Sequence, residues 1–132
     1  MDYADLLYQA AKAEDIAKVE KIKKNRGVNV RNGGNGLAAI QIAAKNGDLD
    51  VVKFLLGKGA DVRLNYYQSK EDTALYIAAE ESHWEIVQLL LAHGSVNFFN
   101  PGEIEEFLLH YSTKMINNKE LHAKVCAMYN CI

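Results

Sequence analysis

The side chains best suited to metal chemistry lie near the C-terminus: His110, His122, Cys126 and Cys131. Histidine nitrogen and cysteine sulfur are preferred ligands of Zn²⁺, and a structural zinc site needs about four of them converging on one point. His122 and Cys126 have the spacing to share one helix face, but Cys131 is out of phase with Cys126. We therefore expect no metal here, and the same phase difference disfavours a disulfide between the two cysteines.

Acidic and glycine-rich segments are the other candidates for chemistry. Glu80 and Glu81 are adjacent acids, but neighbours in a helix point about 100° apart and cannot easily act as a carboxylate pair. The glycine-rich run GGNG at residues 33–36 precedes a helical segment, where a tight turn is needed in any case. The chain has neither a Gly-x-Ser-x-Gly nor a His-Glu-x-x-His motif. The sequence predicts no enzyme and no cofactor.

The composition is that of one globular domain. Of the 132 residues, 49% are hydrophobic and 24% are charged, and the net charge is −2. A protein that coats nucleic acid would carry a large positive charge. No apolar run reaches the roughly 20 residues of a membrane span, and the N-terminus lacks the pattern of a secretory signal. We therefore expect no nucleic-acid or membrane partner and a location in the cytoplasm, where cysteines stay reduced.

A short motif recurs three times, as LYQAA at residues 7–11, IQIAA at 40–44 and LYIAA at 75–79. The paired alanines are separated by 33 residues in the first interval and by 35 in the second. A period of this length is typical of a solenoid, in which each unit packs only on its neighbours.

Each copy continues as a second helix. In the middle copy a polar break at Asn46-Gly47 precedes apolar residues at helical spacing over 51–56, and glycines follow. The third copy repeats this design with apolar residues over 84–91. Ser82 and Glu85 have the spacing of a capping box, which predicts that Ser82 caps this helix. The unit is therefore a helix, a turn, a helix and a loop.

Paired helices at this period, with the landmarks AA, NG, VVKFLL at residues 51–56 and GADV at residues 59–62, resemble the ankyrin repeat. The third copy has TALY where the family has T-P-L-H. No copy keeps the family's histidine, because Tyr8, Gln41 and Tyr76 stand at its position. The resemblance implies an all-α fold, an ankyrin-like solenoid of stacked helix-turn-helix repeats with protruding loops, or fingers.

We expect a single domain over residues 1–132, built from three repeats that span about residues 5–32, 33–65 and 66–99. Asn100, Pro101 and Glu103 form a helix start, with a cap, a first-turn proline and an acidic residue. A degenerate pair of helices over about 100–132 should then cap the end of the stack, since an open end would expose an apolar face.

The resemblance also implies a binding surface, because the fingers and the exposed face of each first helix line a concave groove that binds partner proteins in ankyrin repeats. Carried over by position, it selects Lys12, Ala13, Asn35, Leu37, Lys45, Asn46, Ser69, Lys70, Asp72, Glu80 and Glu81. Tyr66 and Tyr67 join this set, since adjacent tyrosines at a loop tip are large, stiff and amphipathic. Either ring could instead cover the neighbouring repeat.

We expect a monomeric, non-enzymatic module that binds other proteins. Residues 1–70 carry a net charge of +4 and residues 71–132 a net charge of −6, a polarity that could orient a partner or could be neutral variation. One alternative is the targeting or adaptor portion of a larger protein with catalysis elsewhere in its chain. Lysine outnumbers arginine 12 to 3, which hints at an AT-rich genome and at a secreted effector in the host cytosol. The remaining alternative is a metal-dependent protein that uses the C-terminal histidines and cysteines.

Overall fold

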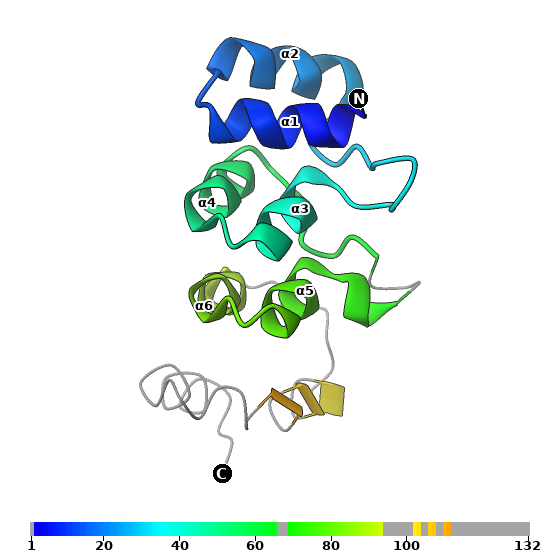
Figure 1. Ribbon diagram of the computed structural model, residues 1–132, viewed down its shortest axis with the longest axis vertical. Helices are drawn as coiled ribbons and strands as arrows, with labels where there is room; N and C mark the ends of the chain where they lie inside the picture. Colours follow the sequence, from blue (N-terminus) through cyan, green and yellow to red (C-terminus); the bar gives the residue numbers. More distant parts are fainter. Residues whose placement is uncertain (1, 66–68, 94–101, 104–105, 108–109, 112–132) are drawn as a thin grey trace.

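The computed structural model describes residues 2–65, 69–93, 102–103, 106–107 and 110–111 (Figure 1). Regular structure in this part of the chain is helical, with one isolated antiparallel bridge between Arg31 and Ala38. The predicted all-α solenoid is confirmed.

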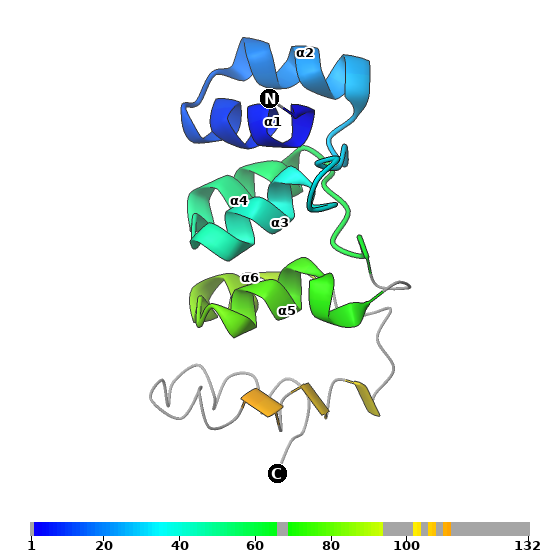
Figure 2. The ribbon, with the colours of Figure 1, turned by 45° about the vertical axis from the view of Figure 1, so that its right-hand side comes forward.

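The helices form three consecutive pairs that stack along the long axis of the molecule (Figures 1 and 2). Each pair joins an inner helix to an outer helix through a short turn, and a longer loop, or finger, leads to the next pair. In chain order the elements are α1 Tyr3–Lys12, α2 Ile16–Arg26, α3 Ala39–Asn46, α4 Leu49–Gly57, the 3-10 turn η1 Lys70–Asp72, α5 Ala74–Glu80 and α6 Trp84–Ala92.

Small residues allow the inner helices to stack closely. α3 contacts both α1 and α5, and α4 contacts α6 in the outer row. The paired alanines of the repeated motif are all buried between these helices: Ala10, Ala11, Ala43, Ala44, Ala78 and Ala79. The outer helices contribute the larger apolar groups predicted from their spacing, with Val51, Val52, Leu55, Leu56, Ile86, Val87, Leu90 and Leu91 buried. The core is therefore one continuous layer that runs through the stack.

Away from the inner helices, polar contacts join the first two repeats. Lys58 Nζ lies 2.6 Å from Glu20 Oε1, and this hydrogen-bonded cation holds the pKa of the Glu20 carboxyl below its ordinary value. The Asn29 side-chain oxygen accepts a hydrogen bond from the Asp61 backbone N–H at 2.8 Å. These contacts fix the register of neighbouring loops as well as of neighbouring helices.

The turn between inner and outer helix has the same conformation in every repeat. The residue two positions before the outer helix is left-handed, with φ of 58° at Glu14, 79° at Gly47 and 60° at Ser82. The next residue then precedes the outer helix, and in the first repeat this residue, Asp15, accepts a capping bond from the Lys18 N–H. The break predicted at Asn46-Gly47 is confirmed.

The capping box predicted at Ser82 is wrong. α6 begins one residue later than that motif requires, with His83 at the N-cap and no capping bond from its side chain. Ser82 occupies the turn position that the repeat needs in the left-handed conformation, whereas an N-cap residue needs extended backbone. The register of the repeat therefore overrides the local capping signal.

Candidate functional site

The exposed surface of the inner helices is set by the repeated motif. The residue after each alanine pair is exposed, and these residues are Lys12, Lys45 and Glu80. Each lies three residues after the third position of its five-residue motif, so the side chains at these two positions share one helix face. This surface, with Asn46 and Glu81 beside it, is called the groove face below.

Two half-buried isoleucines, Ile42 and Ile77, occupy the third position of the second and third motifs, and both pack against the core. In α1 the same position is Gln9, which is exposed. The groove face therefore carries half-buried apolar side chains as well as charged ones in repeats 2 and 3. The two isoleucines were not predicted to belong to this surface. The sequence did contain a signal for them, because the third motif position, which is exposed Gln9 in α1, is apolar in the other two copies.

The first finger is attached to the start of α1. Asn32 Nδ2 donates to Asp5 Oδ2 at 2.7 Å, and the Gly33 backbone N–H donates to Asp2 Oδ1 at 3.2 Å. The finger is therefore held in one arrangement at the side of the stack where the inner helices begin (Figure 2).

Both residues predicted for partner binding in this finger are accessible. Asn35 is exposed, and Leu37 is half-buried. The Asn35 side-chain oxygen accepts a hydrogen bond from the Leu37 N–H at 3.0 Å. This local bond holds the Asn35 side chain beside the accessible leucine.

The second finger is described only in part. Tyr66 and Tyr67, predicted as aromatic anchors, lie outside the described residues. Ser69 is half-buried and its hydroxyl donates to Glu71 at 3.0 Å, and Asp72 is exposed. The backbone of Lys70 begins η1.

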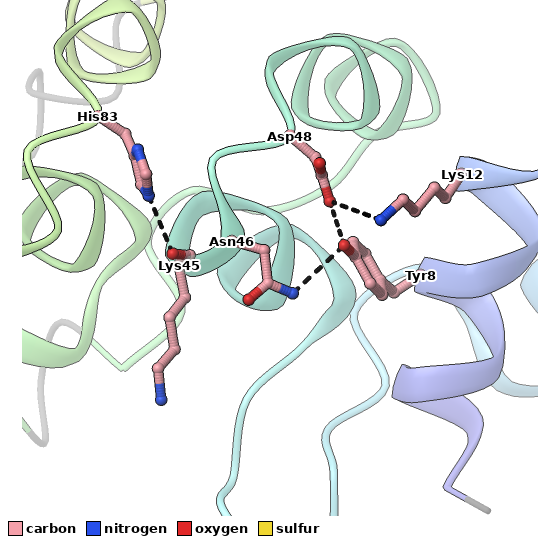
Figure 3. A network of polar contacts seen from close by, with 6 residues as sticks. All are labelled: Tyr8, Lys12, Lys45, Asn46, Asp48 and His83. Carbon is pink, nitrogen blue, oxygen red and sulfur yellow. Dashed lines mark hydrogen bonds and ion pairs between the residues drawn. The ribbon is translucent and has the colours of Figure 1, made fainter.

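A polar network joins the groove face of repeat 1 to that of repeat 2 (Figure 3). The Tyr8 hydroxyl donates to the Asp48 carboxylate and accepts a hydrogen bond from Asn46 Nδ2 at 3.2 Å. Lys12 Nζ lies 3.9 Å from the same carboxylate but remains 60% exposed. The structure thus brings Lys12 and Asn46 together, whereas the Lys45 side chain points away from the network.

The side chains that stand at the position of the family's histidine contact the next repeat in three different ways. Tyr8 uses its hydroxyl on Asp48, as described above. The side chain of Gln41, fully buried, accepts a bond from Ala38 N–H at 2.7 Å and donates one to the Asp72 carbonyl at 2.7 Å. Tyr76 instead makes an edge contact with Phe107, their ring centroids 4.9 Å apart.

His83 connects the second and third repeats on the turn side. Its Nε2 lies 3.1 Å from the Lys45 carbonyl oxygen (Figure 3). Because a carbonyl oxygen can only accept, this nitrogen carries the hydrogen. The ring also lies directly over Gly47, where a Cβ would come within 2.7 Å of it. This close approach accounts for a glycine at that turn.

Of the two acids predicted on α5, Glu80 is already engaged within the chain. It accepts a hydrogen bond from the Tyr111 hydroxyl at 2.7 Å and lies 3.8 Å from His110 Nε2. Glu81, the next residue, is exposed. Burial of the Tyr111 side chain raises the pKa of this phenol above its ordinary range, and the hydrogen bond to Glu80 raises it further.

Alkaline pH should weaken the docking of Tyr111 on α5. Since the folded chain holds the phenol proton more tightly than the unfolded chain, stability should fall as pH rises above about 10, the unfolded pKa. Trp84, the single tryptophan, lies 6.4 Å from the Tyr111 ring and reports on this contact. Unfolding followed by tryptophan fluorescence between about pH 9 and 11 measures the effect. Tyr111→Phe should remove part of the pH dependence, and an unchanged profile would contradict the assignment.

The metal candidates fall mostly outside the described residues, which include His110 but not His122, Cys126 or Cys131. Among the residues whose positions are described, no group of three or more histidine, cysteine, aspartate or glutamate side chains could hold a metal ion. Nor does any helix in this part of the chain have the length and apolar character needed to cross a membrane.

Comparison with known proteins gives consistent relatives. A family model described as ankyrin repeats (3 copies) matches residues 7–100, more than two thirds of the chain. The human ankyrin repeat and KH domain-containing protein 1 is 38% identical over 80 residues, which are 60% of this chain and 3% of that protein. A rice protein named probable E3 ubiquitin-protein ligase XBOS33 is 48% identical over 52 residues, 39% of this chain and 10% of that protein. The human ankyrin repeat domain-containing protein 17 is 42% identical over 60 residues, 46% of this chain and 2% of that protein.

The chain thus spans a tenth or less of the length of these relatives. Repeats of the kind they share are generally protein-interaction modules rather than enzymes. From the matched repeats, the stacked helix pairs and the fingers between them, the chain belongs to the ankyrin repeat family.

Proposed function

We propose that the chain binds a partner protein through its groove face and its fingers. The observation that carries this proposal is the pattern of the inner helices, in which Lys12, Lys45 and Glu81 are exposed beside two half-buried isoleucines. Apolar side chains with polar and charged residues around them are the usual composition of a protein-binding surface. The order imposed on the first finger by Asp2 and Asp5 supports the proposal, since little conformational entropy is lost when an ordered loop binds.

The sign of the charge along this surface favours one orientation of the partner. Lysines occupy the position after the alanine pair in the first two repeats, whereas the third repeat has Glu80 there, followed by Glu81. Glu80 already accepts a hydrogen bond from the Tyr111 hydroxyl and lies 3.8 Å from His110 Nε2, so Glu81 is the more available of the two. The proposed partner is therefore acidic where it meets repeats 1 and 2 and basic where it meets repeat 3.

Charge reversal of the two groove lysines tests the proposal. The double variant Lys12→Glu, Lys45→Glu should weaken partner binding by about tenfold or more, since like charges placed across an interface repel. The matched control Lys21→Glu, Lys53→Glu makes the same charge change at exposed positions of the outer helices and should bind as the parent does. The partner is captured from lysate of the source cells, identified by mass spectrometry and titrated against each purified variant.

Circular dichroism first establishes that both variants are as helical as the parent. Equal affinity for all three chains would contradict binding through the groove face. Loss of affinity in the control alone would move the binding site to the outer helices.

A second proposal is that the chain acts as the targeting or adaptor portion of a longer protein. The small share of each relative that the chain covers favours this reading. An antibody raised against the chain would then detect a protein much larger than 132 residues in source cells. A native protein of the size of the chain would contradict it.

We also propose that the chain is a cytoplasmic monomer without a cofactor. Its three repeats, over about 5–32, 33–65 and 66–99, and a degenerate capping pair of helices over about 100–132 would form a single domain over residues 1–132. Delivery into a host cell by an intracellular microbe stays a prediction from the lysine excess. Detection of the chain in the host cytosol during infection would support it, and detection only inside the microbe would contradict it.

A further inference from the structure

The chain contains three Asn-Gly pairs: Asn32-Gly33, Asn35-Gly36 and Asn46-Gly47. In this dipeptide the glycine backbone nitrogen can react with the preceding asparagine side chain, because glycine has no Cβ to hinder their approach. The nitrogen attacks the side-chain amide carbon and ammonia leaves. The three pairs differ in the hydrogen bonds that surround the reacting atoms, so their reactivities should differ.

At the first pair, the attacking nitrogen already has an acceptor for its proton. The Gly33 backbone N–H donates to Asp2 Oδ1 at 3.2 Å. The amide nitrogen must lose this proton to form a new bond, and a carboxylate at hydrogen-bond distance can act as the general base. Asp2 is exposed, so the proton can pass on to solvent.

The oxygen on which negative charge develops is also stabilised. Asn32 Oδ1 accepts hydrogen bonds from the Gly34 N–H at 2.7 Å and from the Asn35 N–H at 3.1 Å. Attack at the side-chain carbon converts this carbonyl oxygen into the oxyanion of a tetrahedral intermediate. Two fixed backbone donors at such an oxygen are the arrangement that stabilises oxyanions in acyl-transfer enzymes.

The leaving nitrogen lies against a carboxylate. Asn32 Nδ2 donates to Asp5 Oδ2 at 2.7 Å. In the tetrahedral intermediate this nitrogen becomes a basic amine, which takes a proton from solvent before it departs. The negative charge of Asp5 favours the protonated, departing form.

We propose that Asn32 is a site of self-catalysed deamidation, promoted by the folded finger. The Gly33 nitrogen forms a bond to Asn32 Cγ as its proton moves to Asp2, and the Cγ–Nδ2 bond then breaks to release ammonia. Water opens the resulting succinimide to aspartate or isoaspartate. The net reaction consumes one water and releases one ammonia, with no oxidant or reductant.

The other two pairs lack this arrangement. The Gly36 N–H donates to the Asn32 carbonyl, and the Gly47 N–H donates to the Ala43 carbonyl, neither of which is a useful base. Asn35 Oδ1 accepts one described bond, from Leu37 N–H. Asn35 and Asn46 are therefore internal controls for Asn32 within the same chain.

The product would loosen the first finger. A carboxylate at position 32 can no longer donate to Asp5, and it adds a third negative charge beside Asp2 and Asp5. The reaction itself does not depend on the proposed function. If that function holds, deamidation would also disturb Asn35 and Leu37 and so reduce partner binding in one irreversible step.

The test follows conversion at each asparagine in the whole chain. The chain is incubated at neutral pH and physiological temperature, digested, and analysed by mass spectrometry for aspartate and isoaspartate at the three sites. A parallel sample is kept unfolded in urea. Asp2→Asn is the decisive variant, because the asparagine oxygen can still accept the Gly33 hydrogen bond but cannot take the proton. Gly33→Ala supplies a second, since a Cβ there would meet Asp2 Oδ1 at an ordinary 3.5 Å but would hinder attack.

We expect Asn32 to convert fastest of the three asparagines, and faster in the folded chain than in urea. Asp2→Asn should slow Asn32 by about tenfold or more, and Gly33→Ala should slow it at least as much, while Asn35 and Asn46 stay unchanged. The proposal is overturned if Asn32 converts no faster when folded than when unfolded, or if Asp2→Asn leaves its rate unaltered in a chain with native circular dichroism.

Discussion

Replacing Gly47 with alanine is expected to destabilise the fold by about 2–4 kcal/mol. The backbone at this position is left-handed, and a Cβ would come within 2.7 Å of the His83 ring. Backbone strain alone does not account for the effect, because Glu14 and Ser82 adopt the same conformation at equivalent positions. The larger part should come from displacing His83, which also breaks its bond to the Lys45 carbonyl. Urea unfolding measures the loss.

Two further variants separate these contributions. Gly57→Ala is the matched control, since Gly57 is helical and a Cβ there meets nothing within 4 Å. It should leave stability unchanged or raise it by up to about 1 kcal/mol. When His83 is also replaced by alanine, the substitution Gly47→Ala should lower the free energy of unfolding by less than it does in the presence of the His83 ring. If the stability loss of the double variant equalled the sum of the losses of the two single variants, the His83 ring would not determine the effect of Gly47→Ala.

The substitution Gln41→Leu should cost a similar amount, about 2–4 kcal/mol, although it places an apolar residue in a buried site. The Gln41 side chain is fully buried and serves the Ala38 N–H and the Asp72 carbonyl at once. Leucine fills much of the space but leaves both backbone groups without these bonds. Since Asp72 belongs to the next repeat, the loss should also weaken the coupling between repeats 2 and 3.

Gln9→Leu is the control, because it makes the same chemical change at an exposed position of α1 and should shift stability by less than about 0.5 kcal/mol. Unfolding of both variants in urea, monitored by circular dichroism and by the fluorescence of Trp84, measures stability overall and in repeat 3. If Gln41→Leu were as stable as the parent, the two hydrogen bonds would have no structural importance.

The sequence pattern was sufficient to predict the repeat unit. Apolar residues over 51–56 and 84–91 form the buried faces of α4 and α6, as their helical spacing indicated. The polar break at Asn46-Gly47 was also predicted, and the structure places a left-handed glycine there. These features depend on residues close together in the chain.

Contacts between repeats were not predictable in the same way. Tyr8, Gln41 and Tyr76 occupy one register position, yet each reaches a different kind of partner in the following repeat. The nature of that partner depends on how the repeats stack, which spacing along the chain does not reveal. The error at Ser82 has a related cause, since a local capping motif competed with the turn conformation that every repeat shares.

The exposure of the residues proposed for binding was predicted in outline. The charged residues after the alanine pairs are exposed as the resemblance implied, but nothing in the sequence indicated that Tyr111 would engage Glu80. Ile42 and Ile77 were not among the residues predicted for binding. They are half-buried, and so contribute to both the core and the surface.

Site-specific photo-crosslinking tests the central claim most directly. A photoreactive amino acid replaces Lys45 or Glu81 on the groove face and, in control chains, Lys53 or Glu85, which are exposed on the outer helices. Each chain is irradiated in lysate of the source cells, and crosslinked proteins are identified by mass spectrometry. The account predicts one protein crosslinked from both groove positions and from neither outer position. Crosslinking of that protein from Lys53 and Glu85 alone would contradict it.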